Sequence, residues 1–332
     1  MFERILVPLD GSQRAEQAIP FAARIARATQ GSLVFVRVIH PPRSVGIYGS
    51  EPDVAVPSTP FEKHLAEAST YLQQVVEASS QELKGLPVIA DIEPGDIAPA
   101  IFTAARIEQV DLIVMAHHGE TGWTRWILRS VVHQAVRRSP VPVLVLDGQA
   151  AISPAPDSRH VWRALVPLDG SERAECALAP AASLVTALAA PGRAELHLLS
   201  IVNSRASGGD GPIAAYPYGE MPEQVRKGAE LYLERVIQKI QHEPLASLPL
   251  KISASAVISS DVPGAILQRA SQGPGYDFLA MATHGRSGVQ RLLMGSVTER
   301  LLDSAPLPML VVRPFTAGIP EEASALSGST LS

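Results

Sequence analysis

Three small residues near the end of the chain have the types and spacing needed to bind an anion. Gly285 closes a short apolar strand, and after nine further residues Gly295 and Ser296 begin a segment with helical spacing of apolar residues. This brings a loop to a helix N-terminus, where free N–H groups and the helix dipole attract anions. Glycine lets a phosphate approach the backbone, and Ser296 is expected to supply a hydroxyl at the cap. The alternative is that these residues only form a turn and a helix cap.

The elements around this loop occur twice in the chain. Residues 3–26 (ERILVPLDGSQRAEQAIPFAARIA) return as 162–185 (WRALVPLDGSERAECALAPAASLV). The two copies stay in step afterwards, so that Asp10 matches Asp169 and Gly119 matches Gly285. Each copy is too long for a solenoid repeat, which indicates a tandem duplication. We assign the first copy to 1–147, a linker to 148–159, the second copy to 160–314, and a disordered tail to 315–332.

Each copy has the pattern of an α/β domain. Short runs of Val, Ile and Leu alternate with amphipathic helical segments, which predicts two doubly wound domains, each a five-stranded parallel sheet with helices on both faces. Predicted strands of the first copy are 4–9, 33–39, 87–91, 112–115 and 141–146, with helices at 12–29, 61–83, 97–109 and 130–138. Predicted strands of the second are 164–168, 195–201, 251–258, 278–281 and 307–312. Segments 41–60 and 203–222 are interpreted as mobile lids or plain surface insertions.

The glycine loop resembles the nucleotide-binding loop of the universal stress protein family, whose pattern is Gly-x2-Gly-x9-Gly-(Ser/Thr). This chain has the second and third glycines but carries Ala282 at the first position, where the extra methyl either crowds a ribose or is tolerated. In that family the loop holds ATP, and the fold is that of the adenine nucleotide alpha hydrolases, which is Rossmann-like. The resemblance implies that these loop residues contact the nucleotide: Met281, Ala282, Gly285, Gly295, Ser296 and Val297.

The first strand of each copy supplies further candidates. Ligands of open parallel sheets bind outside the carboxyl ends of the strands, where strand order reverses, so Asp169 and Asp10 are expected to point at a ligand. Each could instead form an Asx turn or cap the next helix. The resemblance places Pro167 and Asp169 beside the adenosine and the backbone of Ile201 on the adenine. It implies a weaker site in the first copy, at Pro8, Asp10, Val38, Gly119 and Ser130.

The first copy departs from the pattern at its third glycine. Arg129 stands where the second copy has Gly295. A side chain of this size either fills the phosphate site, binds a phosphate, or extends into solvent. We favour the first reading, and therefore expect the first copy to bind ATP poorly.

Composition excludes several classes of protein. The 332-residue chain has a formal net charge of −5, which argues against nucleic-acid binding. A single cysteine, Cys176, excludes an internal disulfide or a cysteine zinc cluster, and it is interpreted as a buried structural thiol. No apolar run reaches membrane-spanning length and no signal peptide precedes the first strand, so we expect a cytoplasmic protein without membrane contact.

The missing motifs favour binding over catalysis. The sequence has no GxxxxGK[ST], GxSxG or HExxH motif, and His118 and His284, one residue before a loop glycine, have no partners at metal-ligand spacing. We predict an ATP-binding regulatory module of the stress response, with Mg²⁺ carried only by the phosphates. A slow ATPase and a nucleotide-free scaffold stay open as alternatives. The resemblance also implies an internal pseudo-dimer through the last strand of each copy, and the sequence allows a homodimer of the whole chain.

Overall fold

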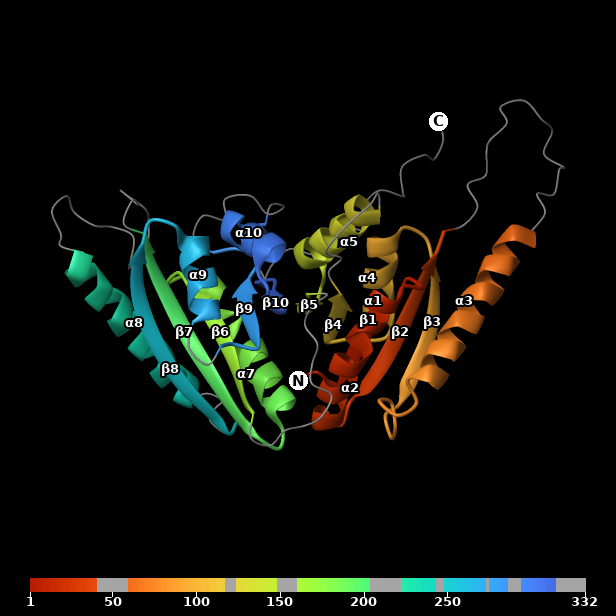
Figure 1. Ribbon diagram of the computed structural model, residues 1–332, viewed down its shortest axis with the longest axis horizontal. Helices are drawn as coiled ribbons and strands as arrows, with labels where there is room; N and C mark the ends of the chain where they lie inside the picture. The colour runs from red at the N-terminus through yellow and green to blue at the C-terminus, as the bar shows by residue number, and fades with distance from the viewer. Residues whose placement is uncertain are drawn as a thin grey trace, which may run out of the picture.

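The computed structural model describes residues 1–40, 59–116, 124–147, 160–203, 222–242, 248–272, 275–285 and 294–314. Within these residues both copies fold as predicted, as parallel strands alternating with helices (Figure 1). The predicted linker and tail, and nearly all of segments 41–60 and 203–222, lie outside them.

The elements occur in the same order in the two copies. Those of the first copy are β1 (Arg4–Pro8), α1 (Gln13–Glu16), α2 (Ala18–Thr29), β2 (Ser32–Ile39), α3 (Thr59–Ala78), β3 (Val88–Pro94), α4 (Ile97–Ile107), β4 (Leu112–Ala116), α5 (Thr124–Arg138) and β5 (Val143–Leu146). Those of the second are β6 (Val161–Leu168), α6 (Glu172–Glu175), α7 (Leu178–Ala189), β7 (Arg193–Asn203), α8 (Pro222–His242), β8 (Leu250–Ser259), α9 (Val262–Ser271), β9 (Phe278–Ala282), α10 (Ser296–Ser304) and β10 (Met309–Val312).

The two five-stranded sheets join into one ten-stranded sheet. Its strand order is β3-β2-β1-β4-β5-β10-β9-β6-β7-β8, parallel within each copy. At the centre β5 and β10 pair antiparallel, with Leu144 opposite Leu310 (Figure 1). Both leucines are at most 1% exposed, so this pairing buries the apolar edge that each copy would otherwise present to water. The predicted pairing through the last strands is therefore confirmed.

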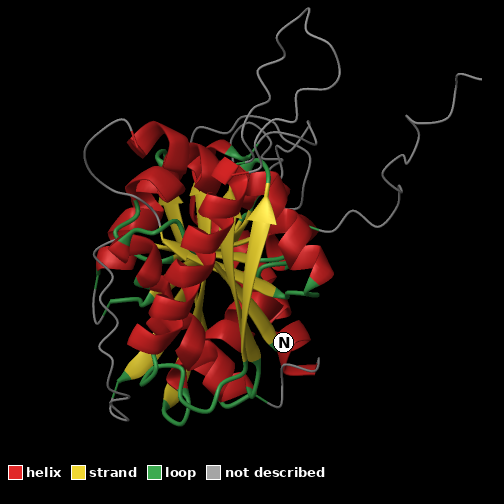
Figure 2. Cartoon of the chain, turned by 90° about the vertical axis from the view of Figure 1, so that its right-hand side faces the viewer, coloured by secondary structure: helices red, strands yellow, loops and turns green. Residues whose placement is uncertain are grey.

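Helices cover both faces of the sheet (Figure 2). One core layer packs under α2, α3, α7 and α8, and the other under α4, α5, α9 and α10. Both layers contain residues of both copies. Side chains also bridge the copies on each face: Arg24 Nε donates to the Leu188 carbonyl at 2.9 Å, and His133 Nε2 lies 3.2 Å from Asp303 Oδ1. Each of the two core layers is thus shared by both copies.

The predicted helix 12–29 is two helices, because a proline interrupts it. α1 ends at Glu16, and Pro20 follows four residues later without an N–H to donate to the Glu16 carbonyl. The second copy breaks in the same way ahead of Pro180, with Cys176 at the C-cap of α6. Cys176 is half-buried, and burial raises the pKa of its thiol to about 11, so the thiol stays protonated at neutral pH.

Two other predicted boundaries differ from the structure. The helix predicted at 61–83 ends at Ala78, and the turns after it lead to Gly85, whose φ of +77° favours glycine. The helix predicted at 130–138 begins at Thr124, six residues earlier. This second difference affects the candidate site of the first copy.

A tyrosine–glutamate hydrogen bond supports the first strand in both copies. Tyr71 Oη donates to Glu16 Oε1 at 3.0 Å, and Tyr232 Oη donates to Glu175 Oε1 at 3.1 Å. Burial, together with the neighbouring carboxylate, raises the pKa of each tyrosine. Each bond fastens a long helix, α3 or α8, to the short helix that follows strand one. The same hydrogen bond is thus present in both copies, where it supports the turn between strand one and the short helix.

A buried polar cluster joins α9 to the sheet in the second copy. His197 on β7 is 9% exposed; its Nδ1 lies 2.9 Å from Ser253 Oγ and its Nε2 lies 2.8 Å from Ser255 Oγ. Arg269 of α9 approaches the same Nε2 to 3.2 Å through Nη2. The first copy has Val34 in place of His197. Burial, and secondly the charge of Arg269, lower the pKa of His197 to about 4.

Protonation of His197 is expected to destabilise the fold in mild acid. The pKa in the folded state, about 4, lies below the ordinary 6.5, so the unfolded chain takes up a proton as the pH falls from 6.5 toward 4. We expect this residue to lower the free energy of unfolding by about 2 kcal/mol between pH 7 and pH 4.5. Urea unfolding at both pH values should show a shallower pH dependence for His197→Gln, which keeps a donor and an acceptor. An unchanged pH dependence in that variant would contradict the assignment.

Candidate functional site

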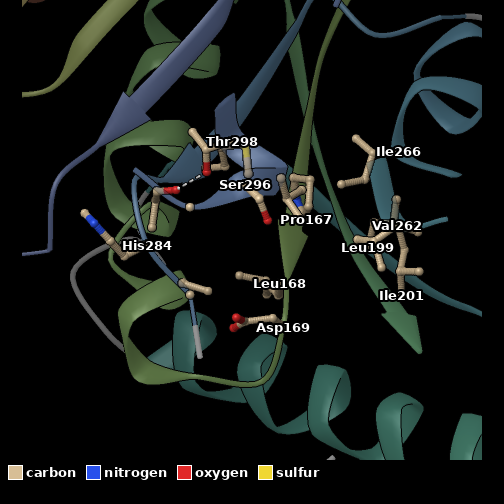
Figure 3. A pocket seen from close by; sticks show the side chains of 16 residues that line it. Pro167, Leu168, Asp169, Leu199, Ile201, Val262, Ile266, His284, Ser296 and Thr298 are labelled. Carbon is tan, nitrogen blue, oxygen red and sulfur yellow. Dashed lines mark hydrogen bonds between the residues drawn. The ribbon is translucent and has the colours of Figure 1, made fainter. Parts of the chain in front are cut away.

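A pocket lies at the carboxyl edge of the sheet in the second copy, where the ends of β6 and β9 diverge (Figure 3). About 670 Å³ of space free of protein atoms lies within it, open solvent at its mouth included. The structure brings all nine residues predicted for this copy to its wall: Pro167, Asp169, Ile201, Met281, Ala282, Gly285, Gly295, Ser296 and Val297.

Seven further residues line the pocket, and of these the sequence points only to His284, as a plausible ribose or turn contact: Leu168, Ala174, Leu199, Val262, Ile266, His284 and Thr298. Leu199 could have been found, because it lies two residues before Ile201 and so shares its face of β7. Val262 and Ile266 have the i, i+4 spacing of one helix face. With Leu199 and Ile201 they make one end of the pocket apolar, whereas Ser296 and Asp169 make the other end polar (Figure 3).

The polar end contains an uncapped helix N-terminus. Gly295 is the N-cap of α10, and the first helical hydrogen bond runs from Glu299 N to Gly295 O at 2.9 Å. The N–H groups between these residues have no acceptor within the helix, and glycine has no side chain to cap them. Ser296 was expected at the cap but occupies the first helical position instead. Its hydroxyl faces the space above Leu168 and Asp169 (Figure 3).

Two hydrogen bonds fix this helix start to β9. Gly295 N donates to Thr283 O at 2.9 Å, and the buried Thr298 Oγ1 donates to Ala282 O at 3.1 Å (Figure 3). Ala282, at the first position of the glycine pattern, is an ordinary strand residue opposite Val312. Its position needs no glycine conformation, and its methyl group forms part of the pocket wall.

Asp169 forms an Asx turn and also lines the pocket. Its Oδ1 accepts from Ser171 N at 3.0 Å and from Ser171 Oγ at 2.6 Å, while Ser171 Oγ accepts from Ala174 N at 3.2 Å and caps α6. Gly170 between them has φ +85°, a conformation that favours glycine. The turn holds the carboxylate at the end of β6, where it reaches the pocket.

A side chain at either of the two loop glycines would meet a different obstacle. A Cβ on Gly285 would lie 2.0 Å from Asp169 Oδ2, so the carboxylate already occupies the place of a side chain. Among the described residues, the atom nearest to a Cβ on Gly295 would be the Thr283 carbonyl oxygen at 3.3 Å, a tight contact that a shift of a few tenths of an ångström would relieve. The fold therefore requires glycine at 285, whereas at 295 it does so much less.

The first copy shares the strand end but not the helix start. Asp10 forms the same Asx turn, with its Oδ1 2.9 Å from Ser12 N and 2.6 Å from Ser12 Oγ. Pro8 pairs with Val36, two residues before Val38. In the second copy Pro167 pairs in the same way with Leu199, two residues before Ile201. Gly119 lies outside the described residues.

The helix start of the first copy differs because α5 does not begin at Ser130, as the sequence predicts. Because α5 begins at Thr124, Ser130 lies inside a helix, and its N–H is at an interior position rather than at an open N-terminus. The structure therefore does not place Ser130 at a helix N-terminus, and a phosphate contact at this residue stays a prediction. The side chain of Arg129 lies outside the described part of the chain, so its role stays a prediction.

Among the described residues, few charged groups lie at the pocket of the second copy. Asp261 at the start of α9 pairs with Arg300 of α10 at 3.4 Å. The His284 ring points away from the space between Ser296 and Asp169 (Figure 3), and its Nδ1 lies 2.9 Å from Thr283 Oγ1. The described residues contain no group of three His, Cys, Asp or Glu that could hold a metal ion. Among their helices, none is both long and apolar enough to cross a membrane.

Removing the Asp169 carboxylate should reduce the loss of stability caused by a side chain at position 285. Gly285→Ala is expected to cost about 2 kcal/mol of unfolding free energy, because its Cβ would overlap Asp169 Oδ2. In Asp169→Ala the space is free, so the double variant should lose at least about 1 kcal/mol less than the sum of the single variants. Asp169→Asn keeps the bulk and should give no such relief. Chemical denaturation of all five variants measures this coupling, and additive losses with both replacements would contradict the steric account.

Comparisons with known proteins agree with this architecture. The model of the universal stress protein family matches residues 1–147 and again residues 162–313. A universal stress protein of Mycolicibacterium smegmatis is 27% identical over 310 residues, 93% of this chain and 97% of the relative. One from Mycobacterium tuberculosis is 23% identical over 311 residues, 93% of this chain and 96% of the relative.

A solved structure shows the same fold over the whole tandem. The crystal structure of a universal stress protein from Archaeoglobus fulgidus matches with a TM-score of 0.65 at 18% identity, covering 95% of this chain and all of its own (100%). Because the family model matches both copies, this chain belongs to the universal stress protein family as a tandem of two such units.

Proposed function

We propose that the second copy binds ATP and that occupancy of its pocket acts as a regulatory signal in the stress response. The observation that carries this proposal is Gly295. It is the N-cap of a helix whose first residues line the pocket, and the packing of the described residues accounts only in part for its lack of a side chain. A phosphate group at the helix N-terminus would explain it, since a phosphate must approach the backbone closely to accept from these N–H groups.

The shape of the pocket supports a ligand with an anionic end and a flat apolar end. Leu199, Ile201, Val262 and Ile266 provide an apolar slot for a base at the end remote from α10. Asp169, at the polar end with Ser296, would face the ribose in this account. The family resemblance adds adenine as the base. ATP has this division into apolar base, ribose and phosphates.

We infer binding rather than turnover from the groups that line the pocket. Asp169 is the acid among them, and its Oδ1 is already engaged by Ser171. Among the described residues the lining contains neither lysine nor arginine to stabilise a departing phosphate. Mg²⁺ would then enter with the phosphates of the nucleotide. A slow ATPase is the alternative, and a placement in the cytoplasm stays a prediction.

The different helix starts support different roles for the two copies. The first copy contributes β5, α2 and α5 to the shared sheet and cores, while its helix start differs at the position that would bind phosphate. We therefore assign nucleotide sensing to the second copy and support of the assembly to the first. Further dimerisation of the chain is left as a prediction.

Replacing Gly295 should separate binding from folding. In a thermal denaturation series with MgATP, ADP and AMP, ATP should stabilise the wild type, by about 2.7 kcal/mol at a hundredfold excess over Kd. Gly295→Arg, which imitates the first copy, should lose this stabilisation. Gly295→Ala, the matched control for loss of glycine, should fold nearly as well as the wild type without ligand, because its Cβ meets only one 3.3 Å contact. Equal stabilisation of the wild type and Gly295→Arg by ATP would overturn the proposal.

A further inference from the structure

A second cavity lies at the junction of the two copies, remote from the carboxyl edge that forms the nucleotide pocket. Its walls are α2, the turn after α3 and the turn after α7, which meet in the lower part of Figure 1. It holds about 1580 Å³ of space, its open mouth included. Its lining residues are Pro20, Ala23, Arg24, Arg27, Ala28, Gln81, Glu82, Lys84, Ala190 and Pro191. We call this cavity the junction groove.

The charges in the junction groove are unbalanced. Among the described residues of its lining, Arg24, Arg27 and Lys84 stand against one acid, Glu82. Among the described residues, none of the three cations takes part in an ion pair. The chain as a whole is acidic, with a formal net charge of −5, so a local excess of positive charge at a concave surface is not a general property of the protein.

Arg24 is held in a fixed position with part of its hydrogen-bonding capacity unused. Its Nε donates to Leu188 O at 2.9 Å, and its guanidinium carbon lies 4.7 Å from the centre of the Trp162 ring. Burial lowers the pKa of Arg24, and the more distant charge of Asp277 opposes this effect. Asp277 is itself bonded to His160 and to the Arg163 N–H. A partly desolvated cation without a carboxylate partner is stabilised when an anion reaches it.

Arg27 and Lys84 are positioned at the opening. Arg27 Nη2 donates to Glu82 O at 2.6 Å, and this bond ties α2 to the turn that carries Lys84. These bonds to the Glu82 and Leu188 carbonyls use one N–H of Arg27 and one of Arg24. With respect to the described part of the chain, the other N–H groups of both guanidinium ions and the ammonium of Lys84 stay available to a ligand.

We propose that the junction groove binds small phosphorylated compounds, with the phosphate between the Arg24, Arg27 and Lys84 cations and an apolar portion against Pro20, Ala23 and Pro191. Guanidinium groups bind phosphate oxygens through paired, charge-assisted hydrogen bonds, and lysine adds a mobile cation. The cavity lies between two units of the chain, where small-molecule sites are frequent. A ligand there would contact both copies and so stabilise their junction. This proposal does not depend on the nucleotide pocket.

Phenyl phosphate is a suitable probe, with phenol and inorganic phosphate as its two halves. Calorimetric titration of the full chain at constant ionic strength should show saturable binding of phenyl phosphate, tighter than that of either half. Arg27→Gln with Lys84→Gln should raise Kd at least about tenfold, because two charge-assisted contacts are lost. Both residues are exposed, so this double variant is expected to fold normally.

The control has the same loss of charge elsewhere. Lys63→Gln with Arg106→Gln removes two exposed cations that do not line the groove, and it should leave Kd unchanged. The proposal is overturned if phenyl phosphate shows no saturable binding, or if both double variants weaken it equally. It is also overturned if Arg27→Gln with Lys84→Gln binds like the wild type, which would place the probe in the nucleotide pocket.

Discussion

The carboxylate of Asp169 and the backbone of Gly285 meet at the carboxyl ends of β6 and β9, and the pocket depends on how closely they approach. The Asx turn fixes the carboxylate, because Ser171 donates two hydrogen bonds to one of its oxygens. The other oxygen occupies the place where a side chain at 285 would begin. Gly285 can therefore lie directly beside the end of β6, and the first residues of α10 line the same pocket. Without this contact the apolar slot and the helix N-terminus would not share one cavity.

The duplication keeps the scaffold and varies the site. Both copies retain the Asx turn and the tyrosine–glutamate bond that support the first strand. They differ where the last helix begins, at Thr124 in one copy and at Ser296 in the other. A shared sheet explains how such divergence is tolerated. The first copy covers the β10 edge and contributes to both core layers, and neither task requires it to hold a ligand.

Much of this arrangement could be predicted from sequence, because it follows from local patterns repeated twice. Alternating apolar strands and helices, the paired LVPLDGS segments and the glycine spacing led to the fold and to nine residues of the pocket wall. What was missed depends on contacts between distant segments. Val262 and Thr298 reach the pocket only through the packing of α9 and α10. The start of α5 at Thr124 was also missed, because the glycine pattern pointed to Ser130.

The structural role of each loop glycine likewise could not be predicted from the sequence. In the sequence Gly285 and Gly295 are equivalent members of one pattern. A side chain at 285 would overlap the Asp169 carboxylate, whereas among the described residues a Cβ at 295 would have one tight contact, at 3.3 Å. The central claim of this account is that a single working nucleotide site follows from that difference and from the two helix starts. Calorimetric titration of the full chain with MgATP tests this directly through its stoichiometry. The account predicts one ATP per chain, and either two equivalent sites or no binding would contradict it.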